Sequence, residues 1–392
     1  MNWKSPSHIE ENKYELPGNW LKIEYFEALN ILFRFENSLR VFVYIILKNE
    51  LKEKWCELSI TSDDEEKSTI NAIAKRRISQ DKNYAYLGYV LNSQLLHLTS
   101  GELIRIITSD NYWKFFKNYF LGTKEIIKNK LDEIGNVRNA VAHFRPIKKG
   151  DIELIKQNSN HTLSQIEKTI QDFISCPDIV PTNTTENWYK ELKTVENLEC
   201  SVNFRQSKNE EWVKLILTFY PPVLHREDFY GSQGLKTLNI KVTQLLIKYK
   251  AFTNQTICVN EYVPNINSKD ANSINPYKEI RFTFSRKNLE KNYAEIKLQL
   301  DEIILQISNE VDLITNDNLA RGAMIEVVNT YVEKNHSKLF SWDNSQFFTE
   351  LDENSPVEYW GRLNYPTSSF VTDTEQYPWM PVTISEDKDL PF

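Results

Sequence analysis

The first 175 residues carry hydrophobic side chains at helical intervals. From Leu21 to Lys54 apolar positions recur every three or four residues without an interrupting Gly or Pro, which predicts one long helix or two helices in line. Further helices are predicted over residues 70–98, 101–120, 125–144 and 162–174. Pro146 follows the fourth of these helices and is predicted to stop it. We therefore predict an N-terminal all-α bundle over residues 1–175.

The pattern changes beyond residue 175. Residues 176–186 are polar and contain two prolines, so we expect a linker there. Four stretches either alternate apolar and polar residues or are continuously apolar, as β-strands are. They are residues 200–204, 212–220, 256–263 and 279–285. Helical spacing recurs at 289–307 and 318–335, and residues 235–249 fit a helix slightly better than a strand. We expect an α+β domain of unknown function, a candidate for a sensor or regulatory role, over residues 187–339 and an irregular acidic, aromatic tail at 340–392.

The composition argues against several classes of protein. With 41% hydrophobic residues in 392, the chain can build real cores and is not a disordered polymer. Only 10 residues are Gly, and neither glycine-rich phosphate-binding motif is present, which argues against a P-loop ATPase or a Rossmann dehydrogenase. The four cysteines stand singly, without partners at zinc-ligand spacing. We expect neither a cofactor nor a metal ion.

The ends of the chain and its apolar runs bear on its location. The N-terminus lacks the basic flank, apolar core and small-residue cleavage site of a secretion signal. The longest apolar run, residues 41–47, is too short to cross a bilayer. We therefore expect a cytoplasmic protein that has no membrane partner.

The formal net charge of -7 is unevenly distributed. Residues 101–150 contain ten Lys or Arg and five Asp or Glu, whereas residues 301–392 contain seventeen acidic and five basic residues. These two windows together account for the whole net charge. An acidic protein can thus present a local basic surface to a nucleic acid, although a merely solvated face explains such a window equally well from charge alone.

One short motif carries candidate chemistry. Residues 134–147 read IGNVRNAVAHFRPI, which places Arg138, Asn139 and His143 near the C-terminal end of the predicted fourth helix. Asn139 and His143 are one helical turn apart, and Arg138 diverges from His143 by about 140° around the helix. A guanidinium can bind a phosphate through two hydrogen bonds, and an imidazole can move a proton at the same phosphodiester. Histidine is also common as a packing or capping residue at helix ends, so the motif alone leaves a structural role open.

Three sequence blocks, in order, resemble the HEPN domain. VRNAVAHFRPI resembles the R-N-x-x-x-H form of its R-x(4-6)-H motif. The preceding residues 98–120 are similar to the abortive-infection branch of this family. FRFENSLRVFV at 33–43 resembles the first HEPN helix, with the polar pair Glu36 and Arg40 one turn apart. The resemblance covers residues 20–175 only.

The resemblance implies a fold, an assembly and a reaction. The fold is a four- or five-helix bundle that forms a homodimer, with two motifs facing each other in one cleft. The activity is that of a metal-independent endoribonuclease, in which the ribose 2′-OH attacks the adjacent phosphate and leaves a 2′,3′-cyclic phosphate. His143 would act as general acid or base, Arg138 would stabilise the charge of the phosphorane, and Asn139 would orient the pair. Glu36 and Arg40 would support them.

The same resemblance suggests partners. RNA is the expected substrate, and the basic residues Arg145, Lys148 and Lys149 beside the motif are expected to bind it. The expected biological role is that of a toxin or antiphage effector of the abortive-infection type, whose C-terminal domain responds to a phage or host trigger.

Two other classes of function stay open at this point. A non-catalytic HEPN module would bind RNA or a partner protein through Arg138 and His143 without cutting. A purely structural helical module would only dimerise. Salt-sensitive RNA binding without cleavage would favour the first class. An Arg138→Ala variant with unchanged binding and toxicity would favour the second.

Overall fold

The computed structural model describes residues 5–10, 13–15, 24–61, 67–82, 93–175, 181, 184–229, 232–317, 321–352 and 354–363. By compactness the chain divides into two units, with the boundary between Gln171 and Asp172. The predicted order, an N-terminal helical region followed by a region of sheets and helices, is confirmed. Most of the predicted linker and the end of the predicted tail lie outside the described residues.

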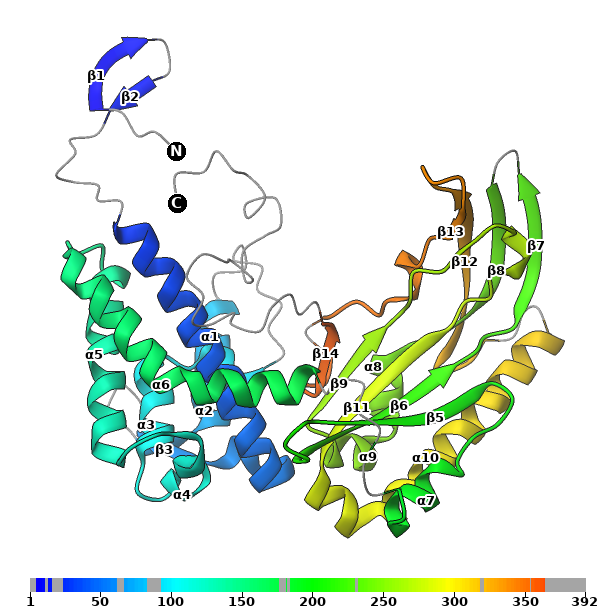
Figure 1. Ribbon diagram of the computed structural model, residues 1–392, viewed down its shortest axis with the longest axis horizontal. Coiled ribbons are helices and arrows are strands. Elements are labelled where there is room, and N and C mark those ends of the chain that lie inside the picture. The colour runs from blue at the N-terminus through cyan, green and yellow to red at the C-terminus, as the bar shows by residue number, and fades with distance from the viewer. Residues whose placement is uncertain are drawn as a thin grey trace. The chain divides into compact units, whose positions relative to one another are not determined.

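Helices dominate the first unit (Figure 1). They are α1 (Glu24–Leu51), α2 (Ile70–Lys82), α3 (Ser100–Thr108), α4 (Trp113–Phe116), α5 (Lys124–Ala142) and α6 (Lys149–Ser175), with 3-10 turns η1 (Lys52–Glu57), η3 (Gln94–His97) and η4 (Lys117–Tyr119). Short antiparallel hairpins accompany them, β1 (Ser5–Glu10) with β2 (Lys13–Glu15) and β3 (Ser59–Thr61) with β4 (Lys67–Thr69). No helix among the described residues combines the length and the apolarity that crossing a membrane requires.

Three predicted helices have different bounds in the structure. The helix predicted at 101–120 is broken after Thr108, because Ser109 adopts an extended conformation and the chain restarts as α4 and η4. The helix predicted at 162–174 begins at Lys149, where the Asp151 carboxylate accepts the backbone N–H of Lys148 at 2.7 Å and caps the first turn. The helix predicted at 70–98 ends at Lys82 as α2, and residues 83–92 lie outside the described part of the chain.

Aromatic packing joins α1 to the segment between α3 and α5. The ring of Phe42 on α1 lies 5.8, 5.5 and 5.9 Å, centroid to centroid, from the rings of Phe116, Tyr119 and Phe120. Phe42 is fully buried, and a side chain of this size contributes about 3 kcal/mol when it leaves water. This contact helps to hold α1 inside the bundle, where α1 also contacts α5.

The second unit contains two five-stranded sheets. Their strand orders are β14-β9-β11-β6-β5 and β10-β13-β12-β8-β7, and neighbours are antiparallel except for the parallel pair β14 and β9. The strands are β5 (Cys200–Gln206), β6 (Trp212–Phe219), β7 (Val223–Phe229), β8 (Ser232–Ile240), β9 (Cys258–Tyr262), β10 (Asn267–Ser268), β11 (Lys278–Ser285), β12 (Ile325–Lys334), β13 (Phe340–Trp342) and β14 (Tyr359–Arg362). The helices are α7 (Asn187–Lys193), α8 (Val242–Lys248), α9 (Lys250–Gln255) and α10 (Arg286–Asn316).

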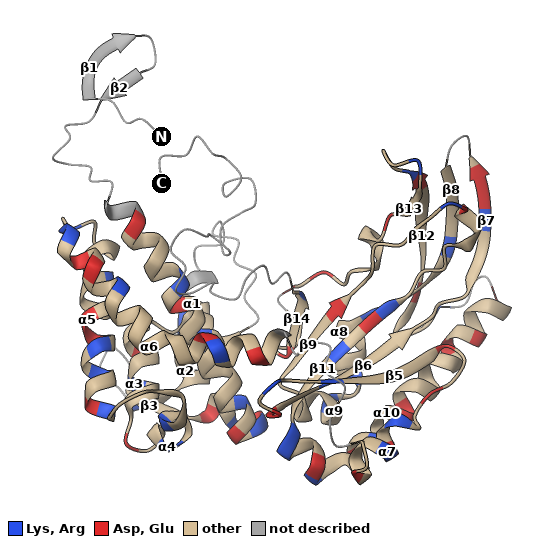
Figure 2. Ribbon diagram, viewed as in Figure 1, with Lys and Arg blue, Asp and Glu red and all other residues tan. Residues whose placement is uncertain are grey.

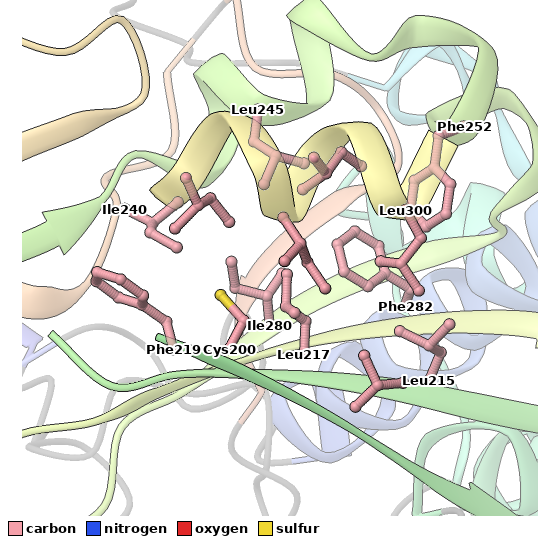
Figure 3. Close-up of a cluster of buried hydrophobic side chains, with 14 of the residues drawn as sticks. Cys200, Leu215, Leu217, Phe219, Ile240, Leu245, Phe252, Ile280, Phe282 and Leu300 are labelled. Carbon is pink, nitrogen blue, oxygen red and sulfur yellow. The ribbon is translucent and has the colours of Figure 1, made fainter. Parts of the chain in front are cut away.

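The core of this unit lies between the first sheet and its helices. Side chains of β6 and β11, including Leu217 and Phe282, meet Leu245 of α8, Phe252 of α9 and Leu300 of α10 (Figure 3). Helix α10 buries residues at intervals of three or four, which is the spacing of one helical face. The sequence prediction of a helix at 289–307 is therefore confirmed and is extended in both directions.

One helix prediction in this half is wrong, and a second is right only in part. Residues 325–334, predicted to be helical, form β12, because IEVVNTYVEK is rich in β-branched residues and pairs along its length with β8. Residues 235–249 split into the end of β8 and the short helix α8. Residues 340–362, which we expected to be irregular, contribute β13 and β14 to the two sheets.

A buried polar network ties the two sheets together. The ammonium of Lys278 on β11 and the carboxylate of Glu261 on β9 lie 3.1 Å apart, and both side chains are fully buried. Lys278 also donates to Asn239 Oδ1, Ile240 O and Phe347 O at 3.1, 2.9 and 2.6 Å. Glu261 accepts the Tyr359 hydroxyl at 2.5 Å and the Thr349 backbone N–H at 3.1 Å. Because a buried charge is costly unless it is paired, this network specifies where β14 and the preceding loop dock.

Candidate active site

The motif lies at the C-terminal end of α5, whose rotation is fixed by its buried face. Ile127, Leu131, Ile134, Val137 and Val141 form that face at intervals of three or four residues, and all are buried. At its start the helix is capped by Thr123, whose hydroxyl accepts the backbone N–H of Ile126. The positions between the buried residues are thereby turned outward, and these positions include Arg138 and Asn139.

The helix ends in a Schellman motif. His143 is the C-cap residue, Phe144 N–H donates to Val141 O at 3.0 Å, and Arg145 N–H donates to Ala140 O at 2.8 Å. Phe144 adopts a left-handed conformation with φ of 53°. The helix therefore ends four residues before Pro146, and the turn at Phe144 terminates it instead of the predicted proline.

Arg138 forms an ion pair with Glu36 across two helices. Nε of Arg138 lies 3.3 Å from Oε2 of Glu36 on α1, although 102 residues separate them in sequence. The Glu36 side chain is 14% exposed and that of Arg138 is 32% exposed. Since the contact uses Nε, the Nη atoms of Arg138 stay available, and neither has a hydrogen-bond partner among the described residues.

Arg40 holds the carboxylate from the other side. Its guanidinium pairs with Oε1 of Glu36 one turn earlier on α1. It also donates to the backbone carbonyls of Leu95 and Leu98, each at 3.2 Å, and to Asn37 Oδ1 at 3.3 Å. Arg40 is thus anchored by backbone oxygens of the segment before α3, and it fixes Glu36, which in turn fixes Arg138. We call Glu36, Arg40 and Arg138 the arginine cluster.

Asn139 and His143 remain at the surface. Both residues are exposed, and they lie one helical turn apart on α5. Within the part of the chain that the structure describes, neither side chain hydrogen-bonds to the arginine cluster. The structure therefore brings together Glu36, Arg40 and Arg138, and it leaves the imidazole and the amide facing solvent at the end of the same helix.

The residues predicted to bind RNA come shortly after His143 in the sequence. Arg145, Lys148 and Lys149 are exposed in the turn between α5 and α6 and at the start of α6. Both signs of charge occur along α1 and α5 (Figure 2), but the residues from Arg138 to Lys149 contain four Lys or Arg and no Asp or Glu. This end of α5 therefore carries a local excess of basic residues, with Asp151 as the next acidic residue along the chain.

Sequence reasoning missed two features of this site. The carbonyl groups of Leu95 and Leu98 orient Arg40, and no side-chain pattern could have predicted a backbone contact of this kind. The second feature is the Phe144 ring, which is 83% exposed. The sequence shows this large apolar residue directly after the motif, but its exposure depends on the turn that ends α5.

The described residues contain no group of three or more His, Cys, Asp or Glu side chains arranged to hold a metal ion. No family model, no curated protein and no solved structure matches the chain.

Proposed function

We propose that the first unit is a metal-independent endoribonuclease of the HEPN type. The observation that carries the proposal is the ion pair between Glu36 and Arg138, because it fixes a guanidinium at a partly exposed position near the end of α5. RNA cleavage without a metal uses a cation that stabilises the phosphorane and an imidazole that moves protons. The Nη atoms of Arg138 can supply the first group, and the exposed imidazole of His143, one to two turns further along the helix, can supply the second. The local excess of Lys and Arg can bind the RNA backbone. The three sequence blocks that resemble HEPN domains support the same reaction.

The proposed reaction is transesterification followed by product release. The ribose O2′ forms a bond to the adjacent phosphorus while the bond from phosphorus to O5′ breaks, which leaves a 2′,3′-cyclic phosphate and a 5′-hydroxyl. The 2′-OH proton passes to a neutral His143 imidazole, and the departing O5′ takes a proton from a protonated imidazole. Arg138 stabilises the negative charge that builds on the non-bridging oxygens, through its Nη atoms. Asn139 orients the imidazole or the phosphate.

Two imidazoles in opposite protonation states would make this reaction concerted. We propose a homodimer in which His143 and His143 of the partner subunit share one cleft, as the resemblance implies. Light scattering of the purified chain tests this assembly, and a mass equal to a single chain at assay concentration would contradict it.

The decisive experiment compares two histidine variants. His143→Ala removes the proposed acid and base, and His161→Ala removes another exposed histidine of the same unit, on α6. Loss of a general acid or base lowers the rate by about 10²- to 10⁴-fold. We expect that loss for His143→Ala, no change for His161→Ala, cleavage that continues in EDTA, and products with 2′,3′-cyclic phosphate ends.

Other outcomes would overturn the proposal. Equal cleavage by His143→Ala and the wild type would remove the catalytic assignment, and products with 5′-phosphate ends that require Mg²⁺ would point to a metal nuclease. Salt-sensitive RNA binding without cleavage would indicate a binding module, in which Arg138 and His143 contact phosphate only. A role as a toxin or antiphage effector further predicts that expression of the wild type slows growth and that expression of His143→Ala does not.

A further inference from the structure

One sheet of the second unit has one covered face and one exposed face. On the covered face, Leu235 of β8 and Val332 of β12 are buried in an apolar cluster with Trp342 and Phe347. Successive residues of a strand point to opposite faces of the sheet. The residues next to Leu235 and Val332 therefore lie on the other face, where β7, β8 and β12 run side by side (Figure 1).

The strand register defines which side chains share this exposed face. Residues directly opposite each other on antiparallel strands lie on the same face. Two rows of three such residues, one from each strand, form what we call the open face: Tyr331, Gly234 and Glu227 in one row, and Glu333, Ser232 and Phe229 in the next.

Two half-exposed aromatic residues border a strand that contributes only small side chains here. Phe229 on β7 and Tyr331 on β12 are each 49% exposed. Between them β8 contributes Ser232 and Gly234. A Cβ atom at position 234 would lie 3.0 Å from Cε2 of Phe229, so this ring lies over Gly234. No side chain longer than that of serine therefore separates the two aromatic residues.

Each row of the open face also carries one carboxylate. Glu227 lies across β8 from Tyr331, and Glu333 lies across β8 from Phe229. Both glutamates are exposed. Within the part of the chain that the structure describes, neither carboxylate has a hydrogen-bond or ion-pair partner. Each row thus combines one aromatic ring with one carboxylate that is available to a ligand.

We propose that the open face binds an extended, arginine-containing segment of a partner protein. A guanidinium stacks on aromatic rings and donates hydrogen bonds to carboxylates, so each row can hold one arginine between its ring and its carboxylate. The face contains two acidic residues and no basic one, which suits a basic partner and disfavours the phosphates of a nucleic acid. The inference concerns the second unit and does not depend on the proposed ribonuclease.

The spacing of the rows specifies the segment. Residues two apart on a strand are separated by about 6.6–6.8 Å, which is also the distance between alternate side chains of an extended peptide. Two arginines with one residue between them therefore match the two rows. Lys236 and His225 lie opposite each other in the following row. A third arginine would be repelled by Lys236, so we expect a neutral or acidic residue at that position of the segment.

The test measures the binding of a defined peptide to the full chain. The probe is the fluorescein-labelled peptide GSRSRSG, and its control peptide has citrulline at both arginine positions. Citrulline keeps the shape of arginine and removes its charge. We expect fluorescence anisotropy to show binding of the arginine peptide that weakens with added salt, and binding of the citrulline peptide that is weaker by about tenfold or more.

Two double variants assign the binding to the open face. Phe229→Leu with Tyr331→Leu keeps apolar side chains and removes both rings. Each contact between a cation and an exposed ring changes affinity by about two- to fivefold, so we expect the Kd to rise by about 5- to 25-fold. Glu227→Gln with Glu333→Gln should raise the Kd by about 2- to 25-fold and reduce its dependence on salt.

A control and a gain-of-function variant separate these effects from misfolding. Tyr220→Leu with Glu196→Gln changes an exposed aromatic and an exposed acidic residue elsewhere in the unit, and should leave the Kd unchanged. Lys236→Glu extends the acidic part by one row and should lower the Kd of the longer peptide GSRSRSRSG by about twofold or more.

Three outcomes would overturn the proposal. The first is an equal Kd for the arginine and citrulline peptides. The second is an unchanged Kd in both double variants of the open face. The third is a change from dimer to monomer in those variants, measured by light scattering, because the open face would then bind a second copy of this chain.

Discussion

Oε2 of Glu36 lies 3.3 Å from Nε of Arg138, and this contact joins the first and fifth helices of the N-terminal unit. The same carboxylate also pairs with Arg40. Two guanidinium groups therefore share one carboxylate, and the arginine cluster keeps a net positive charge. That surplus charge is available to a phosphate only if Arg138 is held in place, so Glu36 is a positioning residue for the proposed reaction.

The first prediction tests this positioning role with a matched pair of variants. Glu36→Gln keeps the size of the side chain and removes the charge that holds Arg138. Glu27→Gln makes the same change on the same helix, where Glu27 pairs with Lys156 of α6 at 2.5 Å. We expect Glu36→Gln to lower kcat about tenfold and the free energy of unfolding by about 1–2 kcal/mol. Glu27→Gln should lower stability by less than 1 kcal/mol and leave kcat unchanged.

Steady-state cleavage of a single-stranded RNA and urea unfolding would check both variants. A rise in KM with unchanged kcat would mean that Glu36 affects binding rather than the position of Arg138 in the transition state. Equal effects of the two substitutions would show that the ion pair of Glu36 is only structural.

The helices of the first unit were predictable where local spacing decides them. The bounds of helix α5 lie within two residues of the predicted ones. Five apolar side chains at helical intervals define the helix, and the cap residue Thr123 defines its start. The contact between Glu36 and Arg138 was not predictable from spacing, since it depends on how α1 packs against α5. The resemblance to HEPN domains named Glu36 and Arg40 as supporting residues, but it did not show that Glu36 would contact Arg138.

In the second unit, strand pairing between distant segments was not predictable from local sequence patterns. The sequence of β12 fits helical spacing, yet its partner β8 supplies a continuous set of hydrogen bonds from residues 232–240. Strand β14 consists of four residues and pairs with β9 about 100 residues earlier in the chain. The buried ends of Lys278, Glu261 and Tyr359 meet at this junction. The spacing of apolar residues within one segment does not show which distant strand that segment will pair with. The pairing depends on which side chains are buried together in the folded protein.

A second prediction concerns the close approach of Gly322 to Glu310. The carboxylate of Glu310 on α10 accepts the backbone N–H groups of Met324 and Ile325, each at 2.9 Å, and so fixes the start of β12. A Cβ atom at position 322 would lie 2.2 Å from Oε2 of Glu310. Gly322→Ala must displace this buried carboxylate, and we expect a loss of about 2–4 kcal/mol.

Gly150→Ala is the control for that substitution. A Cβ atom added at Gly150, in the first turn of α6, meets nothing within 4 Å. We expect this variant to be neutral or more stable by up to about 1 kcal/mol. Urea unfolding of both variants checks the pair, and a neutral Gly322→Ala would show that Glu310 can move without cost.

A third prediction concerns the buried pair of Lys278 and Glu261. Burial lowers the pKa of the Lys278 ammonium from its usual range, while the charge of Glu261 opposes that shift. Lys278→Met would leave the Glu261 carboxylate buried without its cation, and we expect a loss of about 3–5 kcal/mol. The double variant Lys278→Met with Glu261→Gln removes the uncompensated charge and should recover at least half of that loss. If the double variant were as unstable as the single one, the hydrogen bonds of Lys278 to backbone oxygens would be the larger contribution.

The last prediction is a loss of stability of the second unit at alkaline pH. Burial raises the pKa of the Tyr359 hydroxyl above its ordinary value of 10.0, and the neighbouring Glu261 carboxylate raises it further. Burial also raises the pKa of the Cys200 thiol above its ordinary value of 9.0, with Glu199 adding to the effect. A group with a raised folded pKa contributes stability that is complete below its unfolded pKa and is lost as pH rises from that value toward the folded pKa.

The free energy of unfolding should therefore fall above about pH 9, by up to about 1.4 kcal/mol per pH unit for each group once its unfolded form has ionised. Lys278 acts in the opposite direction because its folded pKa is lowered, so the difference between variants is a cleaner test than the total slope.

Tyr359→Phe should be less stable at neutral pH, because it loses its hydrogen bonds to Glu261 and Thr349, but should show a shallower decline above pH 10. Tyr331→Phe, at an exposed position on β12, should keep the wild-type slope. Urea unfolding at several pH values checks these slopes, and a Tyr359→Phe profile parallel to that of the wild type would mean that the buried hydroxyl does not control the alkaline transition.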